Sequence, residues 1–270
     1  MMRPFALLIL LCTAAPAVAQ VPGQLPGPTP REVQALVRSP VEVADSLFLD
    51  EWEPGAALEL LEVYLQGRPN DAEAHWRATR AALVLALSQT EREERRRLLR
   101  LGEALGDSAV AVAPDNIDVL SWAAAAKGRL TIEIGGRRSK VRRGQEVWDM
   151  AHRVLEMDPD HPFAHDILGK LNQEVRKLGS FKRFMARLLM DSDLLEQSTW
   201  ESSEEHLRAA VAADPTVLLF YLDLGETYLL QGKEEEARRT FEAGLEVPDL
   251  YPIDPGFRIR IRQHLTELNR

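Results

Sequence analysis

The sequence predicts an all-α protein in which antiparallel helix pairs stack into an irregular solenoid. Small residues recur where one helix of a pair must approach the other closely, and a proline follows the second helix of each pair at a constant spacing. A single pair cannot bury its own apolar face, so several pairs must stack to form a core. With 45% hydrophobic and 28% charged residues, the composition is sufficient for such a core.

The clearest helix pair lies between residues 218 and 249. Tyr221, Leu224 and Tyr228 follow one another at steps of three and four residues, which places them on one apolar stripe of a helix. The tetratricopeptide repeat has the pattern W-x2-L-G-x2-Y, a turn, A-x3-F-x2-A and a closing proline. Its positions hold Tyr221, Leu224, Gly225, Tyr228, Gly232, Ala237, Phe241, Gly244 and Pro248. The segment therefore resembles this repeat, which implies a binding scaffold.

Four earlier segments share one spacing to a closing proline, with steps of four, three and five residues. They are Ala57, Leu61, Tyr64 and Pro69; Gly102, Gly106, Ala109 and Pro114; Val147, Ala151, Val154 and Pro159; and Ser203, Leu207, Ala210 and Pro215. Ten residues after each of these prolines lies a small residue, namely Thr79, Ala124, Gly169 or Gly225. The sequence therefore predicts five helical hairpins.

These four prolines are 45, 45 and 56 residues apart, whereas the repeat has about 34 residues. We therefore expect lengthened helices or insertions at residues 91–100, 132–143 and 177–200. In the first insertion Glu91 precedes Arg95 by four residues, which favours a solvated helix face. The third is expected to cap the core.

The first 19 residues are typical of a signal peptide. Arg3 precedes an apolar run from Phe5 to Cys12, and Ala17 and Ala19 form a cleavage site. The alternative is a retained membrane anchor, for which the run is short of the roughly 20 residues required. We therefore expect an exported protein, periplasmic or secreted, whose mature chain contains no cysteine.

Residues 20–30 are rich in Pro and Gly and predict a mobile linker. The repeat domain is expected at residues 31–270. The full chain has a formal net charge of −9, which argues against a nucleic-acid partner.

One segment is strongly basic. Arg137, Arg138, Lys140, Arg142 and Arg143 give five basic residues in seven. We expect them to contact an anionic partner, and a solubilising loop is the alternative.

Two further stretches carry a family resemblance. DPDHPFAHDILGKLNQEVRKL, residues 158–178, is a proline-bounded helix with the core residues Leu168, Gly169, Glu174 and Val175. LEVPDLYPIDPGFRIRIRQHLTEL, residues 245–268, is an apolar-Pro-Asp turn followed by a final helix. Together, residues 71 to 268 resemble the tetratricopeptide-like domain of the regulator of microtubule dynamics family.

The resemblance implies an α-helical adaptor. Relatives of this family in eukaryotes are linked to microtubules and organelle membranes. Leu171 departs from the pattern, since many relatives have Trp there. An exported chain would not meet tubulin, so we do not expect the microtubule role, while lipid contact stays open.

The sequence offers one candidate for metal or catalytic chemistry. Carboxylates and imidazoles lie close together at Asp158, Asp160, His161, His165 and Asp166. A helix-start interpretation is preferred, because His161 precedes Pro162 at a position suited to a cap and no third ligand comes from another helix. No phosphate loop or nucleophile elbow is present. We therefore expect neither a cofactor nor an enzyme.

The repeat register predicts a partner-binding groove on the first helices of the hairpins. Its residues are Trp76, Arg80, Ser121, Ala125, Asp166, Lys170, Leu222 and Glu226. Trp76 and Arg80 are the expected anchors, although Trp76 could instead belong to the core. The expected ligand is a protein or peptide. The alternative is a lipid, held by Leu219, Leu222, Leu229 and Leu230 with anionic headgroups at the basic segment.

The signal-peptide interpretation predicts a mature chain that begins at Gln20. Intact-mass measurement of exported protein should show the loss of residues 1–19. A chain that retains Met1 would contradict it.

Overall fold

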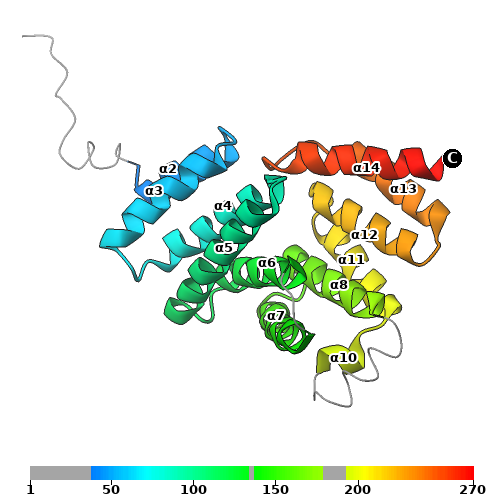
Figure 1. Cartoon of the computed structure of the whole chain (residues 1–270), viewed down its shortest axis with the longest axis horizontal. Coiled ribbons are helices and arrows are strands. Elements are labelled where there is room, and N and C mark those ends of the chain that lie inside the picture. The colour runs from blue at the N-terminus through cyan, green and yellow to red at the C-terminus, as the bar shows by residue number, and fades with distance from the viewer. Residues whose placement is uncertain (1–37, 134–136, 179–192) are drawn as a thin grey trace, which may run out of the picture. The chain divides into compact units, whose positions relative to one another are not determined.

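The computed structural model describes residues 38–133, 137–178 and 193–270 (Figure 1). All regular structure in these ranges is α-helical, which agrees with the predicted fold class. The predicted signal peptide at 1–19 and the linker at 20–30 lie outside the described residues. None of the described helices is both long and apolar enough to cross a membrane.

The five predicted hairpins are present. Their helices are α2 (Pro40–Leu49) with α3 (Pro54–Gly67), α4 (Ala72–Ser88) with α5 (Arg92–Val112), α6 (Ile117–Glu133) with α7 (Arg137–Met157), α8 (Pro162–Lys177) with α11 (Trp200–Ala213), and α12 (Leu218–Leu230) with α13 (Glu234–Leu245). A short helix, α10 (Asp193–Gln197), lies between α8 and α11, and α14 (Asp254–Leu268) follows the last hairpin. The helices of each hairpin contact each other.

The closing prolines mark the ends of the second helices. Helices α3, α5, α7 and α11 each end two residues before their proline. The next first helix then begins with a side-chain cap in three cases. Asp71 accepts a hydrogen bond from the backbone N–H of Ala74, Asn116 accepts one from that of Val119, and His161 accepts one from that of Ala164. These contacts satisfy helix N–H groups that have no partner within the helix. The helix-start interpretation of His161 is therefore confirmed.

Small residues allow the helices of a hairpin to approach closely. A methyl group built on Gly225 of α12 would overlap the ring of Phe241 on α13. A methyl group on Gly169 of α8 would overlap Leu207 on α11 in the same way. In the turn between α12 and α13, Gly232 has φ of +72°, a conformation that glycine adopts without steric cost.

The extra residues of the middle hairpins lengthen their helices. Helices α5 and α7 each have 21 residues, whereas α13 has 12. The solvated face expected for residues 91–100 is only partly formed, because Arg95 turns inward to an ion pair with Glu133 of α6 (3.0 Å). The tertiary partner displaces the local pairing of Arg95 with Glu91. Residues 179–192 of the third insertion lie outside the described ranges.

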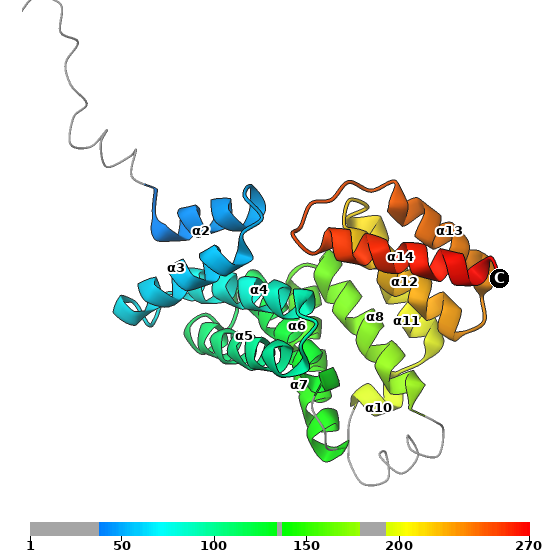
Figure 2. The ribbon, with the colours of Figure 1, turned by 45° about the horizontal axis from the view of Figure 1, so that its top comes forward.

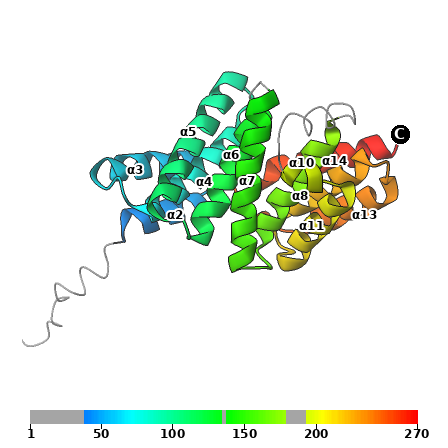
Figure 3. The ribbon, with the colours of Figure 1, turned by 90° about the horizontal axis from the view of Figure 1, so that it is seen from below.

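The first helices form one continuous layer. Helix α6 contacts both α4 and α8, and α8 contacts α12; we call these four helices the first-helix layer. Figure 2 shows α8 between the helices of the two ends, and Figure 3 shows α5 and α7 to either side of α6.

The C-terminal part of the domain turns back along this layer. Between α13 and α14 the chain runs without helix from Glu246 to Ile253, and Figures 1 and 2 show it reaching towards the end of α4. Tyr251 and Ile253 pack against the core cluster that includes Leu83 and Val84 of α4. We call residues 246–253 the return segment.

The close packing at Gly225 predicts a strong effect of a single methyl group. Replacing Gly225→Ala should lower the free energy of unfolding by about 1–3 kcal/mol, because the methyl group overlaps the buried Phe241 ring. Gly55→Ala is the matched control, since nothing lies within 4 Å of the added methyl group. That change should raise stability by about 0.4–1 kcal/mol. Equal effects in urea unfolding would contradict the packing argument.

Candidate functional site

A cavity of about 250 Å³ lies against the first-helix layer. Three of its walls come from α4, α6 and α8, with further residues from α7, α10 and the start of α12. The return segment and the first turns of α14 supply Tyr251, Ile253, Asp254 and Phe257. The cavity therefore depends on elements far apart in the sequence.

The walls of the cavity are mostly apolar. Leu83 and Val84 come from α4, Trp122 from α6, and Phe163 and Ile167 from α8. The rings of Trp122 and Phe163 lie 5.7 Å apart between centroids. Such a concave apolar surface with a few polar groups has the composition of a typical ligand site.

Six charged side chains also line the cavity, namely Arg129, Lys140, Asp166, Lys170, Glu174 and Asp254. Four of them are engaged by hydrogen bonds. Lys140 donates to the carbonyl of Ile132 (2.9 Å), Lys170 to Asp223 (2.5 Å) and Lys177 to Glu174 (2.8 Å). Asp254 accepts from the backbone N–H groups of Leu250 and Tyr251 at 2.8 Å. Arg129 and Asp166 make no hydrogen bond within the described part of the chain.

Lys170 belongs to a buried ionic cluster that joins three helices. Its ammonium group contacts Asp223 (2.5 Å) and Glu226 (3.2 Å), both on α12. Glu226 in turn contacts Arg260 (2.6 Å) and His264 (3.2 Å) of α14. The cluster therefore fixes α14 and α12 against α8.

Two of the carboxyl groups near Lys170, those of Asp223 and Asp166, have pKa values shifted in opposite directions. Burial tends to raise the pKa of Asp223, but the charges of Lys170 and Arg129 outweigh it and lower this pKa. The pKa of Asp166 is raised well above its ordinary value, first by burial and then by the charge of Asp223. Arg129 and Lys170 oppose this shift without cancelling it.

The predicted groove residues divide between the cavity and the core. Ala125, Asp166 and Lys170 line the cavity, and Glu226 lies beside it in the ionic cluster. Leu222 and Ser121 are buried away from the cavity lining. Of the predicted groove residues on α6 and α8, Ala125, Asp166 and Lys170 line the cavity and Ser121 does not.

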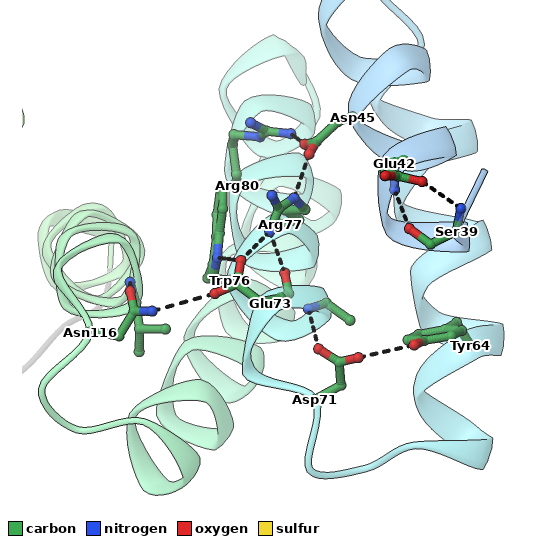
Figure 4. A network of polar contacts seen from close by, with 12 residues as sticks. Ser39, Glu42, Asp45, Tyr64, Asp71, Glu73, Trp76, Arg77, Arg80 and Asn116 are labelled. Carbon is green, nitrogen blue, oxygen red and sulfur yellow. Dashed lines mark hydrogen bonds and ion pairs between the residues drawn. The ribbon is translucent and has the colours of Figure 1, made fainter. Parts of the chain in front are cut away.

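The two expected anchors are internal (Figure 4). Trp76 is only 7% exposed, packs with Ala109 and Val119, and donates its indole N–H to Glu73 (3.0 Å). Arg80 is paired with Asp45 of α2 at 2.6 Å. The surface exposure expected for Trp76 is therefore wrong, because α5 and α6 cover its ring, and the core alternative describes it.

The basic segment does not form one surface in the described residues. Arg143 is paired with Glu103 of α5, and Lys140 caps a carbonyl at the end of α6 and lines the cavity. Arg142 is exposed and lies 3.8 Å from Glu146. The side chains of Arg137 and Arg138 lie outside the described part. Helix α7 turns Lys140, Arg142 and Arg143 in different directions.

The four leucines of the lipid alternative do not share a pocket. Leu219 lines the cavity, Leu222 is in the core, Leu229 packs at the edge of the core, and Leu230 is exposed. Any lipid would therefore have to use the walls described above.

The residues considered for metal binding are separated. His165 contacts His206 of α11 through their Nδ1 atoms (2.9 Å), while Asp166 faces the cavity and His161 caps α8. Burial, together with the nearby histidines, lowers the pKa of His206 to about 4. Among the described residues, no group of three or more His, Cys, Asp or Glu side chains is placed to hold a metal ion.

Comparison with protein families supports the resemblance found in the sequence. The profile for regulator of microtubule dynamics proteins 1–3 matches residues 41–269. The chain belongs to the regulator of microtubule dynamics family.

Curated members of this family are distant from the chain. Regulator of microtubule dynamics protein 2 of Bos taurus is 22% identical over 230 residues, covering 85% of this chain and 56% of that protein. Protein 3 of the same species is 22% identical over 183 residues, covering 68% of this chain and 38% of that protein. The chain spans about half the length of the curated protein 2 relatives it matches.

A solved structure shows the same fold. A thermophilic tetratricopeptide-repeat protein of Thermus thermophilus matches with a TM-score of 0.60 at 21% identity, covering 84% of this chain and 97% of that one. The family member described here therefore has a tetratricopeptide-like helical fold.

Sequence reasoning missed Arg129, Trp122, Asp223 and the return segment. Asp223 left a recognisable signal, because an acidic residue within the apolar helix α12 indicates a buried ionic partner. Arg129 and Tyr251 left none, since their positions depend on how distant helices meet.

The ionic cluster predicts that Lys170→Met is strongly destabilising. The change leaves Asp223 and Glu226 buried without their common partner, which should cost about 3–5 kcal/mol in the free energy of unfolding. Lys177→Met is the control, because the ion pair of Lys177 with Glu174 is more exposed and contributes about 0–1 kcal/mol. Similar losses in thermal and urea unfolding would show that the cluster is not a structural link.

The raised pKa of Asp166 predicts a pH-dependent gain from Asp166→Asn. A carboxyl group whose folded-state pKa exceeds its unfolded-state pKa lowers stability as pH rises between the two values. The variant should therefore be more stable than the natural chain at pH 7, and this difference should shrink towards pH 4. Unfolding curves at both pH values test this, and a gain that does not depend on pH would contradict it.

Proposed function

We propose that this protein is a non-catalytic adaptor that holds an extended apolar segment of a partner polypeptide in the cavity of its first-helix layer. The observation that carries the proposal is the return segment. This non-helical stretch of the chain itself packs Tyr251 and Ile253 against α4 and forms one wall of the cavity. A second extended segment alongside it would meet the same apolar surface.

The match to a tetratricopeptide-like scaffold supports an interaction role in general terms. Stacked helix pairs of this kind present concave surfaces for binding. The family name refers to microtubules, but the predicted signal peptide leads us to propose a cell-envelope or secreted location instead.

A lipid is the second candidate ligand. The apolar character of the walls favours it, since Trp122, Phe163 and Ile167 would contact an acyl chain as readily as a side chain. The basic residues do not add a single anionic-headgroup surface in the described structure, which weighs against a phospholipid.

Site-specific photocrosslinking distinguishes the two candidates. A benzophenone side chain is placed at Ala125, in the cavity wall, and the protein is expressed in its native host. Irradiation should then give a specific polypeptide adduct. Val63 is the control site, because it is 62% exposed on α3 and is not part of the cavity. Mass spectrometry would identify the adduct.

Adducts to lipid at Ala125 would replace the first candidate with the second. The same polypeptides captured at Ala125 and at Val63 would reject the cavity as the binding site.

Filling the cavity should also abolish binding. Ala125→Phe adds a ring to the cavity wall and should reduce capture of the crosslinked partner at least tenfold, while the melting temperature changes little. Val63→Phe should leave capture unchanged. Retained binding in Ala125→Phe would contradict a cavity-bound segment.

A further inference from the structure

Two charged side chains in the cavity wall lack hydrogen-bond partners within the described residues. Asp166 is 6% exposed, and its Oδ1 atom is buried with no hydrogen-bond partner. Arg129 donates no hydrogen bond in the described structure, and the closest approach of its guanidinium group to a carboxylate is 3.8 Å, to Asp223. Both residues line the same cavity.

An unpaired buried oxygen such as Asp166 Oδ1 is unusual in a protein interior, whereas the side chain of Arg129 is 25% exposed. Most buried polar atoms are hydrogen-bonded, and leaving one unpaired costs free energy. The other charged residues of the cavity wall follow this rule, as described above. Arg129 and Asp166 thus offer a guanidinium donor and a carboxyl acceptor that the described part of the chain does not use.

The surrounding charges indicate that the ligand group is neutral. The charged side chains that line the cavity are three basic and three acidic ones, whose formal charges cancel. They are Arg129, Lys140, Lys170, Asp166, Glu174 and Asp254. A charged ligand group would therefore enter an apolar cavity without a counter-charge of its own, which is costly.

Resting on the proposed function, we infer that Arg129 and Asp166 recognise a backbone amide of an uncharged, extended polypeptide segment. The amide carbonyl accepts a hydrogen bond from Arg129, and the amide N–H donates one to Asp166. Aliphatic or aromatic side chains on either side of that amide pack on Trp122, Phe163 and Ile167. The site thereby selects for a peptide backbone in an apolar context.

This inference distinguishes a peptide from an acyl chain. A hydrocarbon chain would leave both Arg129 and Asp166 unpaired, whereas a peptide amide supplies one acceptor and one donor in a neutral group. The polar pair therefore favours the polypeptide over the lipid, although the apolar walls accept either.

The test uses a blocked, uncharged peptide of five aliphatic residues and a set of analogues in which one backbone amide at a time is replaced by an ester. An ester lacks the N–H donor. Binding to the full mature chain would be followed by the NMR shift of the Trp122 indole N–H, which lies in the cavity wall. We expect one ester position to weaken binding by about tenfold, the effect of leaving the buried carboxyl group of Asp166 without a hydrogen-bond partner.

The variants identify the partners of that amide. In Asp166→Ala the sensitive ester position should change binding less than twofold, because the acceptor for the N–H is gone. Arg129→Met should weaken binding of the all-amide peptide about tenfold. Glu235→Gln is the control, since Glu235 is exposed on α13 and does not line the cavity, and it should bind as the natural chain does. Melting temperatures would confirm that each variant is folded.

The outcomes separate this inference from the proposed function. Peptide binding that is insensitive to every ester, or an unchanged ester effect in Asp166→Ala, would overturn amide recognition while the cavity remained a peptide site. Absence of peptide binding would overturn both. A third outcome is that an uncharged lipid displaces the peptide and binds equally well to the natural chain, Asp166→Ala and Arg129→Met. This outcome would assign the cavity to lipid and also overturn the inference.

Discussion

The close approach of each first helix to its second helix is the constraint on which the rest of this structure depends. Gly169 and Gly225 leave no room for a side chain because Leu207 and Phe241 occupy that space. This contact determines which face of each first helix packs against the second helix of its hairpin. The opposite faces of successive first helices must then lie next to one another, and they form the layer against which the cavity lies.

Most charged side chains in that layer are paired with other side chains, although the protein as a whole is acidic. Lys170 and Arg260 together balance the charges of Asp223 and Glu226 and connect α8 and α12 to α14. These charges stabilise the fold and leave the cavity largely apolar. Arg129 and Asp166 are the members that the described contacts leave without hydrogen bonds. The groups available to bind a ligand in the cavity are therefore the polar side chains that the hydrogen bonds and ion pairs of the fold leave unpaired.

Membership of the regulator of microtubule dynamics family accounts for the scaffold and leaves the ligand to be decided by this chain's own residues. At 22% identity, over about half of the length of protein 2 of Bos taurus, what transfers is the arrangement of helix pairs. The two expected anchors show why this matters. Trp76 and Arg80 have the residue types of an interface, but α2, α5 and α6 use them to hold the first hairpins together.

Sequence by itself determined the helix pairs, because their signals are local. The spacing from Ala57 to Pro69 and the small residue at Gly225 each reflect contacts within one hairpin or its turn. Because such contacts recur every three to four residues along a helix, they are visible in the sequence pattern. Only the tertiary structure decided the cavity. Helices α5 and α6 cover the ring of Trp76, Arg95 pairs with Glu133 of α6, and Tyr251 packs on the cluster that includes Leu83 of α4. Each of these contacts joins segments that are distant in the sequence. The spacing of residues within one helix does not predict such contacts.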